Sequence, residues 1–313
     1  MRRVLFGLLF IAAVSAGIAV AAGTKRPAVA GCTVFPKNNP WNQRVDKLPV
    51  AGNSDAIVRS IGSDDTMHAD FGSGRYNGGP IGIPYTSVGR KTKRHRVAFE
   101  YADESDKGPY PIPKNVPIEG GRGADGDRHA LIVDRSRCKL YELFALYPVD
   151  GGRSWRAGSG AIWDLRSNKL RPRGWTSADA AGLPILPGLA RYPEVKRGAI
   201  NHALRFTVSR TRRAYVYPAR HFASSDDNPS LPPMGARLRL KASFDIAGYP
   251  RQSRVVLRAL KRYGMILADN GSDWYVSGAP SRGWNNDDLH SLHNVSGSAF
   301  EVVDTSSLPR PGR

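Results

Sequence analysis

Short segments rich in β-branched and aromatic residues, separated by Gly, Pro and Asn, recur along most of this 313-residue chain. The clearest pair, 129–134 and 139–146, is joined by a short polar turn and predicts a hairpin. Further strands are predicted at 96–101, 202–208, 214–217, 238–240, 265–268, 274–276 and 300–303. Helices are predicted only at 54–61 and 254–263, with shorter helical turns at 192–198 and after Asn286. Because strands and helices do not alternate regularly, the pattern favours a mainly β fold, a β-sandwich or jelly roll with long loops.

The pairing of these strands follows from the turns between them. Asn270-Gly271 between 265–268 and 274–276 is a strong short hairpin signal, and 202–208 is expected to pair with 214–217. No linker composition interrupts residues 96–304, so we expect one domain over 23–313.

The N-terminus indicates the compartment. Met1-Arg2-Arg3 followed by an apolar run to residue 22 is typical of a secretory signal peptide, and no other segment is apolar enough to span a membrane. We therefore expect a secreted protein, extracellular or periplasmic, without stable membrane insertion. Cys32 and Cys138 are then expected to form a disulfide. By closing a loop of about a hundred residues, it would add about 4–5 kcal/mol to the free energy of unfolding.

The formal net charge is +19, and the basic residues are spread over the whole chain. Such a charge favours acidic partners, such as an anionic polysaccharide, and the export signal argues against nucleic acid. An Arg-rich coding bias would give the same composition without a functional reason.

Residues 148–200 contain no convincing strand, which predicts a long ordered loop. It carries Trp155, Trp163 and Trp175 among several arginines. An indole offers a flat face to a sugar ring and Arg can grip carboxylates, so these tryptophans, with Arg128 and Arg205, are the candidate substrate-binding residues. The alternative is that the tryptophans pack the loop onto the sheets.

Carboxylates near the hairpin are candidates for acid–base chemistry. Glu142 alternates with apolar residues on its strand, which predicts a desolvated carboxyl group with a raised pKa. Asp127 and His129 lie at the start of the opposite strand, and Glu104 lies in an acidic, Pro-rich loop. A structural Glu–Arg or Glu–His pair, or a solvated acidic turn, would explain the same residues without catalysis.

Asp179 and His202 complete the candidate catalytic residues. Asp179 follows Trp175-Thr176-Ser177, and His202 faces the same side of its strand as Leu204. A functional role requires Asp179 to meet a histidine in space; otherwise His202 is a core histidine.

Other motifs predict little. The glycine pattern at 121–126 leads into a strand rather than a helix, so it is not a dinucleotide site. His290 and His293 alone are a weak metal signal. We expect no metal and no cofactor.

Several stretches of the chain also carry a resemblance. They are Phe35-Pro36 with Asn39-Pro40-Trp41-Asn42, Glu104-Ser105-Asp106 with Gly108-Pro109-Tyr110-Pro111, Trp175-Thr176-Ser177-Ala178-Asp179, His202-Ala203-Leu204-Arg205-Phe206 and Pro232-Pro233-Met234-Gly235. With these motifs the chain resembles a family of secreted bacterial proteins without an assigned function. The resemblance implies export.

These observations predict a secreted carbohydrate-active enzyme that hydrolyses a polysaccharide, with Glu142 and either Glu104 or Asp127 as the acid–base pair. Two alternatives remain open. One is a lyase for an acidic glycan, with His129 or His202 as the base. The other is a non-catalytic glycan- or wall-binding module.

Overall fold

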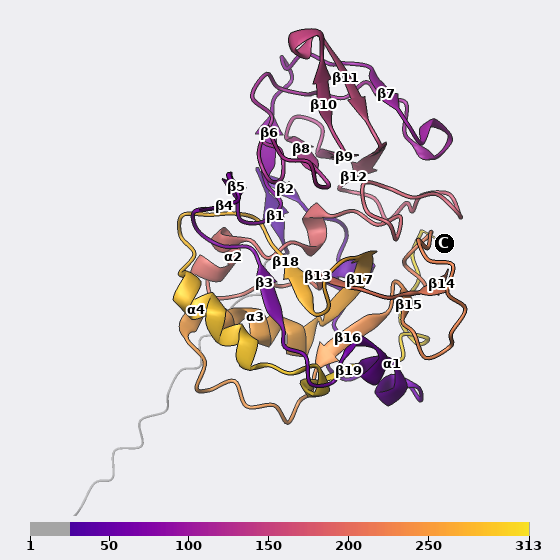
Figure 1. Cartoon of the computed structure of the whole chain (residues 1–313), viewed down its shortest axis with the longest axis vertical. Coiled ribbons are helices and arrows are strands. Elements are labelled where there is room, and N and C mark those ends of the chain that lie inside the picture. Colours follow the sequence, from indigo (N-terminus) through magenta and orange to yellow (C-terminus); the bar gives the residue numbers. More distant parts are fainter. Residues whose placement is uncertain (1–25, 313) are drawn as a thin grey trace, which may run out of the picture.

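A computed structural model describes residues 26–312 of the chain. The predicted signal peptide, residues 1–22, lies outside the described residues. The predicted mainly β fold is confirmed: several sheets and a few short helices make up the molecule (Figure 1).

The strands are β1 Ala28–Val29, β2 Cys32–Thr33, β3 His68–Asp70, β4 Arg75–Tyr76, β5 Gly79–Pro80, β6 Tyr85–Val88, β7 Val97–Phe99, β8 Ala130–Asp134, β9 Lys139–Phe144, β10 Tyr147–Val149, β11 Ser154–Ala157, β12 Ser159–Asp164, β13 Leu204–Val208, β14 Arg212–Tyr215, β15 Pro233–Met234, β16 Arg237–Leu240, β17 Met265–Asn270, β18 Tyr275–Ser277 and β19 Phe300–Val302. The α-helices are α1 Ser54–Ile61, α2 Tyr192–Lys196, α3 Arg251–Arg262 and α4 Asn286–His290. The 3₁₀ helices are η1 Pro40–Asn42, η2 Ala102–Glu104, η3 Asp150–Gly152, η4 Leu186–Gly188, η5 Ser291–Asn294 and η6 Gly297–Ala299.

The largest sheet has six strands in the order β19-β16-β17-β13-β18-β3. It is mixed, because β13 runs parallel to β17 and antiparallel to β18, while β3 runs parallel to β18. Helix α3 packs against β16 and buries an apolar face that includes Val255, Val256, Leu257 and Leu260. The main core therefore includes one face of this helix as well as the sheet.

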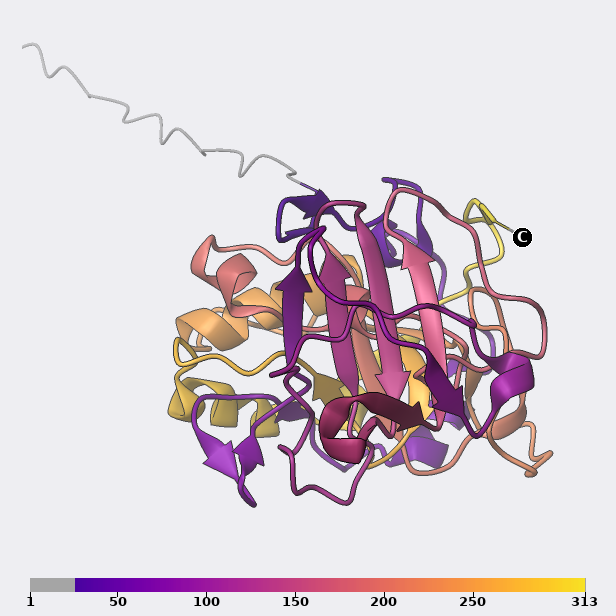
Figure 2. The same ribbon diagram turned by 90° about the horizontal axis from the view of Figure 1, so that it is seen from above.

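The second sheet has four strands in the order β12-β9-β8-β6, and Figure 2 shows them side by side. Alternation along β8 divides its side chains between two cores. Leu131 and Val133 belong to the main core, which they share with the six-stranded sheet. Ala130 and Ile132 belong to a smaller core, which also takes in Trp155 from the three-stranded sheet β10-β11-β7. The four-stranded sheet is thus covered on both faces, which explains why its hairpin is so apolar.

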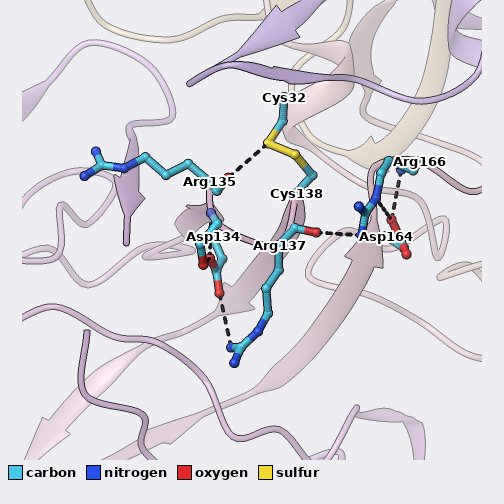
Figure 3. Close-up of a disulfide and its surroundings, with 8 residues drawn as sticks. Cys32, Asp134, Arg135, Arg137, Cys138, Asp164 and Arg166 are labelled. Atoms are coloured by element: carbon cyan, nitrogen blue, oxygen red, sulfur yellow. Dashed lines mark hydrogen bonds and ion pairs between the residues drawn. A yellow bond between two sulfur atoms is a disulfide. The ribbon is translucent and has the colours of Figure 1, made fainter. Parts of the chain in front are cut away.

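The predicted disulfide is confirmed. Cys32, on β2, is bonded to Cys138, in the turn of the β8–β9 hairpin, across a sequence separation of 106 residues (Figure 3). The turn around it is held by charged side chains, with Asp134 accepting from Ser136 and pairing with Arg137. The bridge ties the first described strands to the four-stranded sheet.

Three predictions about the fold are wrong. The segment 148–200 is not a single loop, because β11 and β12 lie within it and place Trp155 and Trp163 on strands. The Asn270-Gly271 turn does not make a hairpin either, since β13 lies between β17 and β18 in the sheet. Likewise 202–208 does not pair with 214–217, because β14 pairs with β15. In the last two cases a partner far away in the sequence displaces the local one.

Within residues 26–312, no helix is long and apolar enough to cross a bilayer.

Candidate functional site

A row of polar side chains crosses the middle of the six-stranded sheet. Asp70 at the end of β3 lies opposite Ser277 at the end of β18. On the next strand, Arg205 of β13 donates from Nη1 to Ser277 Oγ at 2.6 Å. Parallel pairing of β3 with β18 therefore brings together residues that are about 130 to 210 positions apart in sequence.

Arg205 lies at the centre of this row and is buried. Its guanidinium holds the buried carboxylate of Asp179 in a bidentate pair, with Nε–Oδ2 at 2.9 Å and Nη2–Oδ1 at 2.6 Å. Asp269, from the end of β17, is a third member, with Oδ2 at 3.3 Å from Arg205 Nη2. Burial opposes the charged form, but Asp179 and Asp269 raise the pKa of Arg205, which stays a cation. Burial and the Asp179 charge raise the pKa of Asp269 well above its usual range.

His129 faces this cluster from the four-stranded sheet. Its Nδ1 lies 2.5 Å from Glu119 Oε2 and its Nε2 lies 2.9 Å from the carbonyl oxygen of Ala178. Both partners are acceptors, so both ring nitrogens carry a proton and the ring is an imidazolium. Burial alone would lower its pKa, but the Glu119 carboxylate raises the pKa of His129 to about 9. Burial raises and His129 lowers the pKa of Glu119, and the net direction is downward.

An acidic pocket opens beside this ion pair. Its acidic lining residues are Asp70, Glu119, Asp125 and Asp127, and the cavity has a volume of about 590 Å³. Its walls are the turn 76–82 and the loop 119–128. Asp70 is an exposed residue by its solvent-accessible surface, but neighbouring groups crowd its carboxyl group, and this desolvation and the Glu119 charge raise its pKa, opposed by Arg205. The pocket therefore holds one carboxyl group that retains its proton more strongly than usual and one that releases it more easily.

One part of this pocket could hold a metal ion. Ligand atoms of Glu119, Asp127 and His129 lie within 4.8 Å of one another. The histidine is already bound at Nδ1 by Glu119 and at Nε2 by a carbonyl oxygen, and as an imidazolium it offers no lone pair. A metal would have to displace a proton from a buried ion pair, so the arrangement fits an ion pair better than a metal.

Glu142 does not lie in this pocket. Its side chain is inaccessible to solvent, and its two oxygens accept from the backbone N–H groups of Ile185 and Leu186 and from Trp163 Nε1, at 2.9–3.1 Å. Burial raises its pKa to about 7, against the lowering effect of these donors. The sequence correctly indicated a desolvated carboxyl group, but the structure places it where it anchors the segment leading into η4.

Glu104 also lies away from the pocket. Its Oε2 accepts from the backbone N–H of Thr176 at 2.7 Å, and its carbonyl oxygen accepts from Arg171. Arg171 also pairs with Asp106 at 2.7 Å. The acidic loop before Pro109 therefore holds the segment 171–176 in place. Of the two residues predicted as partners of Glu142, only Asp127 lines the acidic pocket, and Glu142 does not.

His202 and Asp179 do not meet. His202 is fully buried and bonded through Nε2 to Glu194 at 3.2 Å and to Arg191 at 2.9 Å. Its Nδ1 lies 2.7 Å from the carbonyl oxygen of Ala203. The structure pairs Asp179 with Arg205 instead, which makes Asp179 a member of the cluster beneath the acidic pocket.

The three tryptophans do not form an exposed sugar-binding face. Trp155 and Trp163 are buried at 7% and 5% exposure, and Trp175 is half-buried under the guanidinium of Arg171. Arg128 is buried too, but it lines the acidic pocket. Of the predicted substrate-binding residues, Trp155 and Arg128 line sizeable pockets.

Sequence reasoning missed Asp70, Glu119 and Asp269. Glu119 directly precedes the Gly120-Gly121 turn, and Asp70 precedes a turn-rich segment. Both are therefore polar residues next to a turn, which is the one local feature that could have marked them. Nothing local shows that they share a pocket, because the sheets join them through strands far apart in sequence.

Comparison of this chain with protein-family models, curated proteins and solved structures found no match.

Proposed function

We propose that the chain is a secreted carbohydrate-active enzyme that hydrolyses a glycosidic bond of a polysaccharide, and that the acidic pocket holds the bond that is cleaved. The observation that carries this proposal is the opposite pKa shift of two carboxyl groups, Asp70 and Glu119, in one pocket. Environments that push the pKa values of two groups apart mark the group with the raised pKa as the acid, here Asp70, beside a group held as a carboxylate, here Glu119. The disulfide supports a compartment outside the reducing cytosol.

The side chains divide the chemistry as follows. Desolvation of the Asp70 carboxyl group and the Glu119 charge raise the pKa of Asp70, so Asp70 is the group suited to be the general acid that protonates the leaving oxygen. Glu119 is fixed as a carboxylate by the His129 imidazolium and maintains that proton on Asp70. Asp127 is exposed in the same pocket, within 4.8 Å of Glu119, and serves as the base that activates water.

This assignment changes one member of the acid–base pair expected from sequence. Asp127 remains, and Asp70 takes the place of Glu142, which substrate cannot reach. A lyase reaction would need His129 or His202 as a base. Both nitrogens of His129 already face acceptors, and His202 is fully buried, so neither is available to take a proton from a glycan.

The test is a panel of neutral and acidic polysaccharides, read by release of reducing ends and by the absorbance of unsaturated products. We expect reducing ends without unsaturated products. Asp70→Asn and Asp127→Asn should each lower the rate about 100-fold or more, while the thermal unfolding midpoint stays within a few degrees. Asp103→Asn, at an exposed position outside the pocket, is the matched control.

Three results would overturn the proposal. Full activity of both pocket variants would remove the acidic pocket from the reaction. Unsaturated products would establish a lyase. Binding of a polysaccharide without release of any product from the whole panel would establish the binding module.

A further inference from the structure

A second pocket lies on the other side of the loop 119–128. It has a volume of about 700 Å³, within the range typical of sites for small organic ligands. Arg122 and Arg128 line both this pocket and the acidic one, so the two cavities share a wall. We call it the basic pocket, and its basic lining residues are Lys93, His95, Lys114, Arg122, Arg128 and Arg153.

All the charged side chains that line the basic pocket are positive. No Asp or Glu occurs among its lining residues. Burial and the charge of Lys93 lower the pKa of His95, which indicates a neighbourhood already rich in positive charge. Such a concave surface concentrates anions.

Arg128 adds a buried cation without an ion-pair partner to the wall of this pocket. It is buried at 3% exposure, and its guanidinium donates only to backbone carbonyl oxygens, those of Leu146, Arg122 and Ala124. Its face also packs on the ring of Tyr147 at 4.1 Å. Among residues 26–312 it forms no ion pair, whereas buried charges in proteins are generally paired.

The floor of the basic pocket is apolar. It consists of Ile112, Val116, Ile118 and Trp155, all buried. The indole N–H of Trp155 is buried, and it finds no acceptor in the part of the chain that the structure describes. The Gly151-Gly152 turn lines the pocket next to this indole and covers it without side chains. A ligand that shifts this turn slightly would supply the acceptor that the indole lacks.

We propose that the basic pocket binds an acidic saccharide, a hexuronate whose carboxylate is held by the cations and whose ring lies on the apolar floor. An inorganic anion would use the cations but leave the floor and the indole without partners. A neutral sugar would use the floor and leave the cations uncompensated. The proposal concerns binding alone and does not require the acidic pocket to be catalytic.

The test is calorimetric titration of the mature protein with a hexuronate oligosaccharide, a neutral oligosaccharide of equal length, benzoate and inorganic phosphate. The hexuronate should bind about tenfold or more tightly than the neutral sugar, because charge-assisted hydrogen bonds distinguish them. Its affinity should fall as salt is raised.

Variants locate the site. Lys114→Ala and Arg153→Ala, at exposed positions on the rim, should each weaken hexuronate binding about tenfold without loss of fold. Trp155→Phe keeps an aromatic ring in the floor and removes the donor, so it should weaken binding severalfold. Arg262→Ala, exposed on α3, is the control and should bind normally.

Equal affinity for neutral and acidic sugars would overturn the proposal, as would tighter binding of benzoate or binding of phosphate alone. An equal loss in the Arg262→Ala control would mean that binding follows net charge rather than this pocket. Asp70→Asn should keep full hexuronate affinity, so failure of the hydrolase proposal and failure of the hexuronate proposal give different results.

Discussion

The ion pair between His129 and Glu119 makes a sharp prediction about stability and pH. His129 is a buried cation whose charge is balanced chiefly by Glu119, with Asp127 favouring and Arg205 opposing the charged ring. Glu119→Gln keeps the shape of the side chain and removes the charge. Without this carboxylate, the main interaction that raises the pKa of His129 is lost. The folded variant then contains either a neutral His129 or a buried imidazolium without an ion-pair partner, and both destabilise the fold.

The size of the effect follows from the pKa. A rise from 6.5 to about 9 corresponds to about 3 kcal/mol of differential stabilisation of the native state. Because the folded pKa of His129 is raised, this contribution is complete below pH 6.5 and is lost as pH rises through 9. The pKa of Glu119 is lowered, so its contribution is complete above its ordinary value of 4.5 and is lost as pH falls through the lower folded value. The pair therefore stabilises the fold most between about pH 4.5 and 6.5.

Urea unfolding of the wild type and of Glu119→Gln at pH 5.5, 7.5 and 10 measures this contribution. The variant should be about 3 kcal/mol less stable at pH 5.5, and the difference should shrink towards zero at pH 10. Glu100→Gln, at an exposed position, should match the wild type at every pH. A difference that is constant from pH 5.5 to 10 would refute the ion pair, since loss of packing alone does not titrate.

Three further substitutions follow from the same contacts. Replacing Cys32 and Cys138 by Ser should lower the unfolding free energy by about 4–5 kcal/mol, read from the urea midpoint and compared with the wild type with and without reductant. Asp179→Asn removes the bidentate partner of the buried Arg205 and should cost about 3–5 kcal/mol; a cost below about 1 kcal/mol in a calorimetric scan would contradict the assignment. Glu142→Gln should destabilise by about 1–3 kcal/mol, while polysaccharide hydrolysis per folded molecule stays at the wild-type level.

Local patterns were sufficient where the interaction itself is local. The hairpin of β8 and β9 needed only two apolar segments and a polar turn, and α1 ends at Gly62, as its φ of 114° requires. The helix spans the predicted residues, with Asn53 as its N-cap residue. The hydroxyl of Ser54, its first residue, accepts from the backbone N–H of Val302 in a distant strand, a contact that the local pattern does not predict.

Pairing over long distances was beyond the sequence pattern. The strand character of 265–268 and 274–276 was correct, but β13, from about sixty residues earlier, lies between them. A hairpin signal in the sequence describes the turn, but it does not show whether another strand pairs with the same strand edges. The acidic pocket has the same origin, since Asp70 and Glu119 reach it from separate sheets and turns.

The segment 177–186 ties the two sheets to the candidate site. The carbonyl oxygen of Ala178 accepts from His129, Asp179 binds Arg205, and the N–H groups at 185 and 186 bind Glu142. The segment has little regular structure, and buried ionic side chains hold it on both sides. These side chains bind backbone carbonyl and N–H groups that would otherwise pair within a strand or a helix. The segment thus contacts both His129 and Arg205, and these two cations lower the pKa of Glu119. They also lower the pKa of Asp269, which burial and Asp179 raise overall. Asp179→Asn should therefore lower catalysis as well as stability, and shift the alkaline limb of the pH–rate profile, which follows the proton on Asp70. Cys32→Ser with Cys138→Ser should lower stability alone.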